Sequence, residues 1–268
     1  MAPRKIRRAF AVGTAGLAVL LSGCNISPSA PAPTPETESE REKPRLGLMT
    51  SLPLYWPLNA DLADIASGAA APPWQRRLLE RDYELVPLDT LSPIQGLSEE
   101  AGDTDPLSGL DLIAVIQPRG LSAADNAALD GWVRGGGRLL IALDPLLTGE
   151  YDIALGDPRR PNDTALIPPV IPRWGIANTY AENLTEVRYA ELPGGRVPVW
   201  MGSNLSLAEG ADNANLCRVH DSGLILRCDS VGKGTVTYIG DATLFEHRDL
   251  IGADGEAIAA LLAYAFAN

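Results

Sequence analysis

The chain has 268 residues, of which 34 are acidic and 22 are basic, giving a net charge of −12 at neutral pH. Residues 1–23 contain four basic and no acidic residues, so without them the chain has 18 basic and 34 acidic residues and a charge of −16. This excess of negative charge argues against nucleic acid as a partner and against a basic surface that grips anionic lipid.

The N-terminus has the layout of a secretory signal peptide. Four basic residues occur among the first eight, and an apolar run follows over residues 9–21. A helix of that length rises about 20 Å, which is too short for a hydrocarbon core of ~30 Å. The run ends in Leu21-Ser22-Gly23-Cys24, which resembles a bacterial lipobox. We therefore expect cleavage of residues 1–23, export, and attachment to a membrane through lipid on Cys24. Because Arg7-Arg8 also weakly resembles a twin-arginine signal, the export route stays open.

Residues 24–44 are expected to be a lipidated cysteine followed by a tether. The segment is rich in Pro, Ser, Ala and Glu and has no apolar periodicity, so it cannot bury enough surface to offset its chain entropy. Asn25, rather than Asp, after the lipid cysteine favours the outer membrane by resemblance to other lipoproteins. Residues 45–268 are then long enough for one large folded domain.

The first half of this domain alternates short apolar runs with helical patterns. The run Leu112–Ile116 is apolar throughout, as expected for a strand covered on both faces. Ser122, with Asp125 three residues later, predicts a capping box, and three glycines at 135–137 end that helix. A strand, a helix and a strand joined by short loops predict a right-handed parallel crossover. We expect strands at 46–49, 84–88, 112–116 and 139–143, and helices at about 74–81 and 122–134.

The pattern breaks over residues 149–178, where prolines at 158, 161, 168, 169 and 172 forbid a regular helix. An irregular excursion of this length is often a lid or a binding loop, and a rigid strap that covers the core is an equal alternative. Residues 186–228 predict short antiparallel strands, 235–239 a further strand and 257–266 a closing helix. The fold class is therefore α/β, with a mostly parallel sheet and an antiparallel extension.

The remaining two cysteines lie in a predicted hairpin. With a two-residue loop at Ser222-Gly223, Val219 faces Leu226 and Cys217 faces Cys228 directly. A loop of three residues would place Cys217 opposite a different neighbour and separate the sulfur atoms. In an oxidising exported compartment we expect a disulfide between Cys217 and Cys228.

Three segments carry a family resemblance: 111–118, 136–145 and the "GKG, strand, GD" pattern of 232–242. They resemble the glutamine-amidotransferase-like domain of auxiliary, non-ATPase proteins of uncharacterised ABC-type transport systems, including the gliding-motility type. The resemblance implies a doubly wound, flavodoxin-like sheet (the class I amidotransferase-like fold) with its first strands in the order 2-1-3-4, and a role beside an ABC-type exporter. Members of that family usually carry spanning helices, and this chain has no segment long enough for one.

The sequence does not provide the residues that several kinds of chemistry require. An amidotransferase needs a cysteine on a tight strand-to-helix turn, served by a histidine and an acid, and neither Cys217 nor Cys228 stands at such a turn. The chain has only two histidines, without paired ligand spacing, so a His/Cys metal site is not expected, although a carboxylate-bound cation stays open. We predict no catalytic residue and no cofactor.

Polar residues follow the predicted parallel strands at their C-terminal ends, which in an open sheet converge on one crevice. The alternatives are that the aspartates cap local turns and that the aromatic residues are buried packing. The candidate binding crevice comprises Thr50, Ser51, Tyr55, Trp56, Gln117, Asp144, Asp241, Glu246 and His247.

The sequence favours a non-catalytic envelope lipoprotein that binds a protein partner or a small ligand. One alternative is an envelope hydrolase that uses Asp144, Asp241, Glu246 or His247 with water or a metal. Another is a structural lipoprotein that bridges envelope components. A deep pocket with a carboxylate of shifted pKa would favour the enzyme, and a shallow crevice with an exposed apolar rim would favour a protein partner.

Overall fold

A computed structural model describes residues 42–58, 60–96, 102–180, 186–200, 202–210, 216–221 and 223–267. The proposed signal peptide, the lipid site at Cys24 and the tether up to residue 41 lie outside this part of the chain. None of the helices in the described residues is long and apolar enough to cross a membrane.

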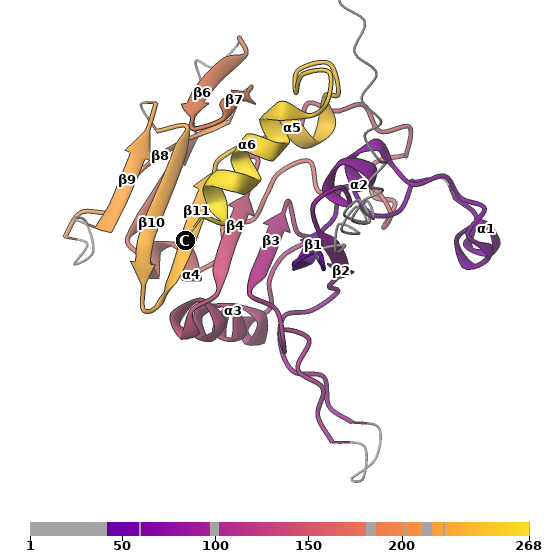
Figure 1. Cartoon of the computed structure of the whole chain (residues 1–268), viewed down its shortest axis with the longest axis horizontal. Coiled ribbons are helices and arrows are strands. Elements are labelled where there is room, and N and C mark those ends of the chain that lie inside the picture. The colour runs from indigo at the N-terminus through magenta and orange to yellow at the C-terminus, as the bar shows by residue number, and fades with distance from the viewer. Residues whose placement is uncertain are drawn as a thin grey trace, which may run out of the picture. The chain divides into compact units, whose positions relative to one another are not determined.

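The core of the fold is a seven-stranded sheet with the strand order β2-β1-β3-β4-β11-β10-β9 (Figure 1). Its first five strands in that order run parallel, whereas β10 and β9 run antiparallel to their neighbours. The expected α/β fold with a mostly parallel sheet and an antiparallel extension is confirmed. The bounds are β1 (Arg45–Thr50), β2 (Glu84–Pro87), β3 (Leu112–Ile116), β4 (Arg138–Ala142), β11 (Gly234–Ile239), β10 (Ile225–Val231) and β9 (Cys217–His220).

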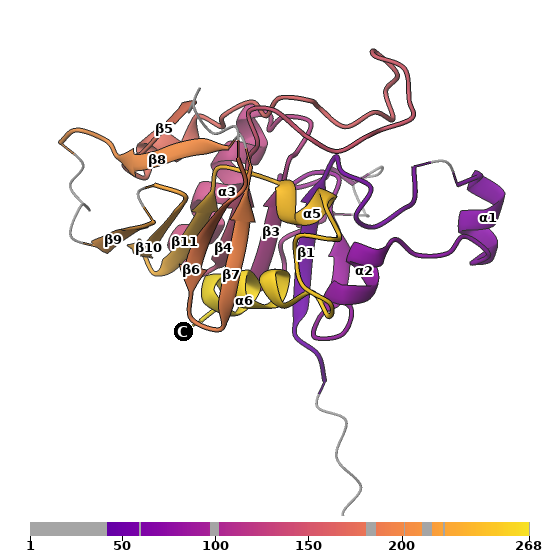
Figure 2. The ribbon, with the colours of Figure 1, turned by 90° about the horizontal axis from the view of Figure 1, so that it is seen from above.

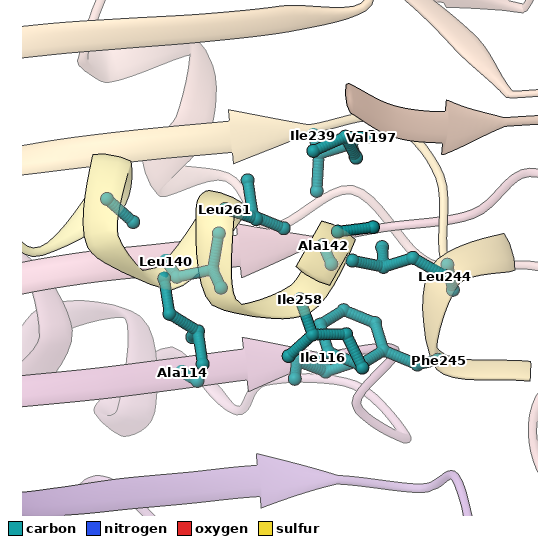
Figure 3. Close-up of a cluster of buried hydrophobic side chains, with 14 of the residues drawn as sticks. Ala114, Ile116, Leu140, Ala142, Val197, Ile239, Leu244, Phe245, Ile258 and Leu261 are labelled. Carbon is teal, nitrogen blue, oxygen red and sulfur yellow. The ribbon is translucent and has the colours of Figure 1, made fainter. Parts of the chain in front are cut away.

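Apolar side chains of the central strands pack on both faces of the sheet, because successive residues of a strand point to opposite sides. On one face, Ala114 and Leu140 belong to a cluster with Ile258 and Leu261 of α6 (Glu256–Ala265) (Figure 3). The same cluster contains residues of α2 (Trp74–Leu79) and of α5 (Thr243–Glu246). On the other face, Ile113 and the neighbouring apolar residues of β4 pack against α3 (Ala123–Gly135) and α4 (Val170–Arg173).

The helix α3 begins and ends at the residues that the sequence predicts. The Ser122 hydroxyl accepts a hydrogen bond from the Asp125 N–H, and the Asp125 carboxylate accepts one from the Ser122 N–H. At the other end, Gly136 has φ of 127°, a conformation that disfavours side chains. A β-carbon on Gly137 would lie 2.4 Å from the Trp132 ring, so this close turn requires glycine.

Two antiparallel ribbons pack against the core without being hydrogen-bonded into the seven-stranded sheet (Figure 2). One pairs β5 (Ile176–Tyr180) with β8 (Ser203–Leu207), and the other pairs β6 (Arg188–Leu192) with β7 (Gly195–Val199). Thus, among the strands of the described residues, only β9 and β10 form the antiparallel extension of the main sheet. Regular structure also resumes earlier than predicted, at α4, so the irregular stretch is better described as the loop 144–169, between β4 and α4. A short helix that the sequence analysis did not predict, α1 (Leu62–Ser67), follows β1.

Cys217 and Cys228 form a disulfide, with an S–S distance of 2.02 Å. The strands β9 and β10 pair in the register expected for the two-residue loop, with Val219 opposite Leu226 and Cys217 opposite Cys228. The bridge therefore clamps the outer edge of the sheet.

Candidate functional site

The C-terminal edge of the parallel strands is where the sequence analysis places the candidate residues. The structure brings all nine to this edge but divides them by their surroundings. Gln117, Asp144 and Asp241 are completely buried, at 0% exposure. Glu246 and His247 are half-buried beside the start of the 144–169 loop. The other four, Thr50, Ser51, Tyr55 and Trp56, line an open cleft.

The two buried aspartates are held by backbone N–H groups. Asp144 accepts hydrogen bonds from the N–H of Leu146 at Oδ1 (2.8 Å) and of Ala242 at Oδ2 (2.9 Å). Asp241 accepts from the N–H of Thr243 at Oδ1 (2.7 Å) and of Trp200 at Oδ2 (2.9 Å). These bonds join the ends of β4 and β11 to each other and to the segment between β7 and β8.

The surroundings of these aspartates change their acidity. Burial, with the nearby carboxylate of Asp241 as the second cause, raises the pKa of Asp144 to about 9. Burial likewise raises the pKa of Asp241 to about 7, although the N–H groups of Trp200 and Thr243 act in the opposite direction. Two carboxylates in such a place do not both ionise readily, so the pair retains a proton near neutral pH.

The expectation that Asp144 and Asp241 line an open binding crevice is therefore wrong, because neither side chain is accessible to a ligand. They do lie together at one edge of the sheet, but neither exposes any surface to a ligand. Their carboxylates accept hydrogen bonds from backbone N–H groups near the strand ends. This is the alternative in which the aspartates cap local turns.

Gln117 likewise has a structural role, because its side chain is buried and not accessible to a ligand. Its backbone is in the left-handed region, with φ of 44°. Its side-chain amide donates to the carbonyl groups of Asp144 (3.2 Å) and Asn162 (2.9 Å), while its Oε1 accepts from the Asp144 N–H (2.8 Å). One buried side chain thus connects the end of β3, the end of β4 and the 144–169 loop.

Glu246 fastens the beginning of the same loop. Its carboxylate accepts hydrogen bonds from the N–H groups of Thr148 and Gly149, each at 3.1 Å, and from the Tyr151 hydroxyl. Burial and the neighbouring Glu246 raise the pKa of Tyr151 well above its usual value, so this phenol stays a donor. The adjacent His247 shares a hydrogen bond of 2.9 Å with the Thr148 hydroxyl. The hollow beside Glu246 is small, at about 170 Å³.

The open cleft has a volume of about 350 Å³ and lies above the ends of β1, β2 and β3; we call it the β1–β3 cleft. Residues 50–58 after β1 form one wall, and residues 87–89 after β2 form another. Arg119, just after β3, and Arg159, from the 144–169 loop, complete it. Because the chain proceeds from β1 to β2 on one side and then to β3 on the other, this is the point where the direction of strand succession reverses.

The wall after β1 is anchored in the core and presents aromatic rings. The Ser51 hydroxyl donates to the Gln117 carbonyl oxygen at 2.6 Å, and Leu54 is fully buried. The Arg76 guanidinium stands 4.1 Å from the centre of the Tyr55 ring and 5.2 Å from that of Trp56. Trp56 nevertheless keeps 45% of its surface exposed, so its ring is held in place and accessible.

Sequence reasoning missed Arg119 and Arg159, and also Asp89, which lines the cleft after β2. Arg119 and Asp89 each stand within three residues of the end of a parallel strand, so the rule that located Thr50 could have found them. Arg159 gives no such signal, because it reaches the cleft through long-range contacts of a proline-rich loop.

Among the described residues, no group of three or more His, Cys, Asp or Glu side chains is arranged to hold a metal ion.

Neither a search with protein-family models nor a search of curated protein sequences finds a match to this chain. Among solved structures, an exo-β-1,4-mannosidase from an Opitutaceae bacterium is similar with a TM-score of 0.48 and 14% identity, over 84% of this chain and 36% of the mannosidase. A β-galactosidase from Bacillus circulans has a TM-score of 0.43 and 10% identity, over 83% of this chain and 31% of the galactosidase. A ThuA-like protein from Bacteroides uniformis has a TM-score of 0.40 and 11% identity, over 88% and 94% of the two chains.

The chain spans about a third of the length of the two glycoside hydrolases. All three TM-scores are below 0.5, so no functional argument rests on these similarities. They do correct the sequence analysis: the similar structures are ThuA-like proteins and glycoside hydrolases, and no family model matches. The resemblance to an amidotransferase-like domain of ABC-type transport auxiliaries is therefore wrong, and the role beside an exporter loses its basis.

Proposed function

We propose that this protein is a non-catalytic, lipid-anchored envelope protein that binds a small ligand in the β1–β3 cleft. The observation that carries the proposal is the position of the cleft. In open parallel sheets, ligands bind outside the C-terminal ends of the strands at the point where strand succession reverses, and the order β2-β1-β3-β4 is that of flavodoxin-like sheets.

The form of the cleft supports a small molecule. Its volume of about 350 Å³ falls within the range of roughly 300–1,000 Å³ that is usual for small-ligand sites. Buried apolar residues such as Leu48 and Leu52 line it, together with the exposed ring of Trp56. Apolar walls with a few polar groups are the composition that such sites have.

A hydrolase is less well supported. Its acid or base must reach the substrate to within about 3 Å. Asp144 and Asp241 have no exposed surface, and the carboxylate oxygens of Glu246 already accept hydrogen bonds from the 144–169 loop. We therefore attribute the raised pKa values of the two aspartates to their buried structural positions and not to catalysis.

The proposal is tested by screening small molecules against the protein, produced with its own N-terminal sequence and purified from the fraction that contains it. Thermal shift identifies compounds that stabilise the fold, because a ligand that binds only the folded state raises its stability. We expect such compounds to bind at least about tenfold more weakly to Trp56→Ala, which removes the accessible ring of the cleft.

Tyr180→Ala is the matched control, since Tyr180 is an equally exposed aromatic residue on β5 that does not line the cleft. Compounds whose affinity falls in Tyr180→Ala but not in Trp56→Ala would overturn the proposal. Absence of any stabilising compound would overturn it as well.

A further inference from the structure

The 144–169 loop is attached to the sheet next to the β1–β3 cleft by three successive hydrogen bonds. The Gln117 amide donates to the Asn162 carbonyl oxygen (2.9 Å), and the Asn162 amide donates to the Arg119 carbonyl oxygen (2.9 Å). The Arg119 guanidinium in turn donates to the Arg160 carbonyl oxygen (3.1 Å). This attachment fixes the loop segment that carries Arg159 to the cleft.

A second set of contacts, within the loop itself, fixes the conformation of the same segment. The Arg160 guanidinium donates to the carbonyl groups of Tyr151 (3.0 Å) and Ile153 (2.9 Å) and pairs with Asp163 (2.8 Å). One guanidinium group thus bonds to three other residues of the loop, and Pro158 and Pro161 flank the arginines. The segment therefore has little freedom to leave the cleft. The backbone that carries Arg159 is therefore held in place beside the cleft.

The charge inside the cleft is opposite to that of the whole protein. Two arginines, Arg119 and Arg159, line it against one acid, Asp89. Within the described residues, Arg119 forms no ion pair within 4 Å, while Arg159 pairs with Asp157, which does not line the cleft. The cleft lining thus carries one more basic than acidic side chain, whereas the chain as a whole has 34 acidic and 22 basic residues.

We propose that the cleft binds a small, ring-bearing, hydroxylated acid, with its carboxylate or phosphate group between Arg119 and Arg159. This inference rests on the proposed function and names the ligand class of the same site. The guanidinium groups donate to the acid group, as arginine does to carboxylates and phosphates. The ring of the ligand packs on the exposed face of Trp56, and the carboxylate of Asp89 accepts a hydrogen bond from a hydroxyl group.

The test compares three probes that share one ring: glucose, glucuronate and glucose 6-phosphate. Isothermal titration calorimetry on the protein with its own N-terminal sequence measures each affinity at low and at high salt. We expect at least one of the two acids to bind about tenfold or more tightly than glucose, and the difference to shrink in salt. Comparison of the two acids shows whether the site prefers carboxylate or phosphate.

Two variants locate the effect. Arg119→Ala and Arg159→Ala should each weaken the acid about tenfold while changing the affinity for glucose less than about twofold. Arg77→Ala, an exposed arginine on α2 outside the cleft, should leave both affinities unchanged. Circular dichroism confirms that each variant is folded.

The results separate this inference from the proposed function. Equal binding of glucose and the acids, weakened by Trp56→Ala, would keep the cleft as a ligand site and overturn its preference for acids. The same conclusion follows if none of the three probes binds at roughly 10 mM while the screen yields compounds that depend on Trp56. Acid binding that survives both arginine variants would place the acid elsewhere and end the inference.

Discussion

The Asp144 carboxylate, at the end of β4, accepts a hydrogen bond of 2.9 Å from the backbone N–H of Ala242, just beyond the end of β11. A parallel pair of strands has no turn to close its end, and here one buried side chain supplies the missing acceptor. Because this carboxylate is sealed from solvent, its protonation is a matter of stability and not of ligand contact.

Asp144→Asn should change how stability depends on pH. With a pKa of about 9 in the folded protein against about 3.9 unfolded, the proton on Asp144 stabilises the fold fully below about pH 4, and this contribution is lost as the pH rises towards 9. The variant cannot titrate, so its stability relative to wild type should improve steadily from about pH 5 to 9. Urea unfolding at a series of pH values measures the difference.

At the acidic end the same variant should be less stable than wild type by about 1–3 kcal/mol. Its side chain has one acceptor oxygen, so it can accept from the N–H of Leu146 or of Ala242 but not from both. Asp89→Asn, at an exposed position, controls for an aspartate-to-asparagine change away from the buried pair. A stability difference between Asp144→Asn and wild type that stays constant from pH 5 to 9 would show that the pKa of Asp144 is not raised in the folded protein.

Asp125 should show the opposite dependence. Burial raises its pKa, but hydrogen bonds from Ser122, Thr90 and the Leu91 N–H outweigh burial and hold the pKa well below its usual value. The carboxylate therefore stabilises the fold above about pH 4, and this contribution is lost as the pH falls into the acid range. Asp125→Ala should lower the free energy of unfolding by about 2–3 kcal/mol at pH 7, measured by urea unfolding.

Ser122→Ala separates the two tasks of Asp125. It removes the helix cap but leaves the bonds from Thr90 and Leu91, so it should cost only about 1 kcal/mol. Equal losses in the two variants would mean that the connection to residues 90–92 contributes nothing.

The Cys217–Cys228 disulfide should stabilise the fold by about 3 kcal/mol in the chain-entropy model. The double variant Cys217→Ser, Cys228→Ser should unfold at correspondingly lower urea concentration, and dithiothreitol should bring wild type close to it. The control is the double variant itself, on which dithiothreitol should have no effect. Two thiols that titrate in unfolded, unreduced wild type would rule the bridge out.

We expect Cys24→Ala to abolish labelling with radioactive palmitate and to leave an uncleaved or soluble product. One acyl chain holds a protein only marginally and two or more hold it stably, so wild type should resist extraction with salt. Labelling that persists in the variant would place the lipid elsewhere or disprove the anchor.

Local sequence signals predicted much of the fold. Ser122 and Asp125 mark the start of α3 because their side chains and backbones satisfy each other within four residues. The run Leu112–Ile116 reads as a buried strand because every residue is apolar. The ribbons β5–β8 and β6–β7 were not separable from the main sheet, since strand pairing depends on partners far away in sequence.

The candidate site was predicted only as far as strand direction determines it. Parallel strands place Thr50, Gln117 and Asp144 at one edge, as expected. Which of them meets solvent depends on N–H groups from later segments, such as that of Ala242, and on the path of the 144–169 loop. No periodicity in the sequence carries that information, and so the contribution of Arg159 from the 144–169 loop could not be predicted.

The direction of β1 has a practical consequence. The strand begins at Arg45 and ends at Thr50, which lines the cleft, so its two ends are five residue steps or about 17 Å apart. Whatever precedes the domain is therefore joined to it on the side remote from the cleft. Immobilising the protein through its N-terminal segment should leave the cleft accessible from solution, so a sensor surface prepared in that way reproduces the presentation that a lipid anchor would give.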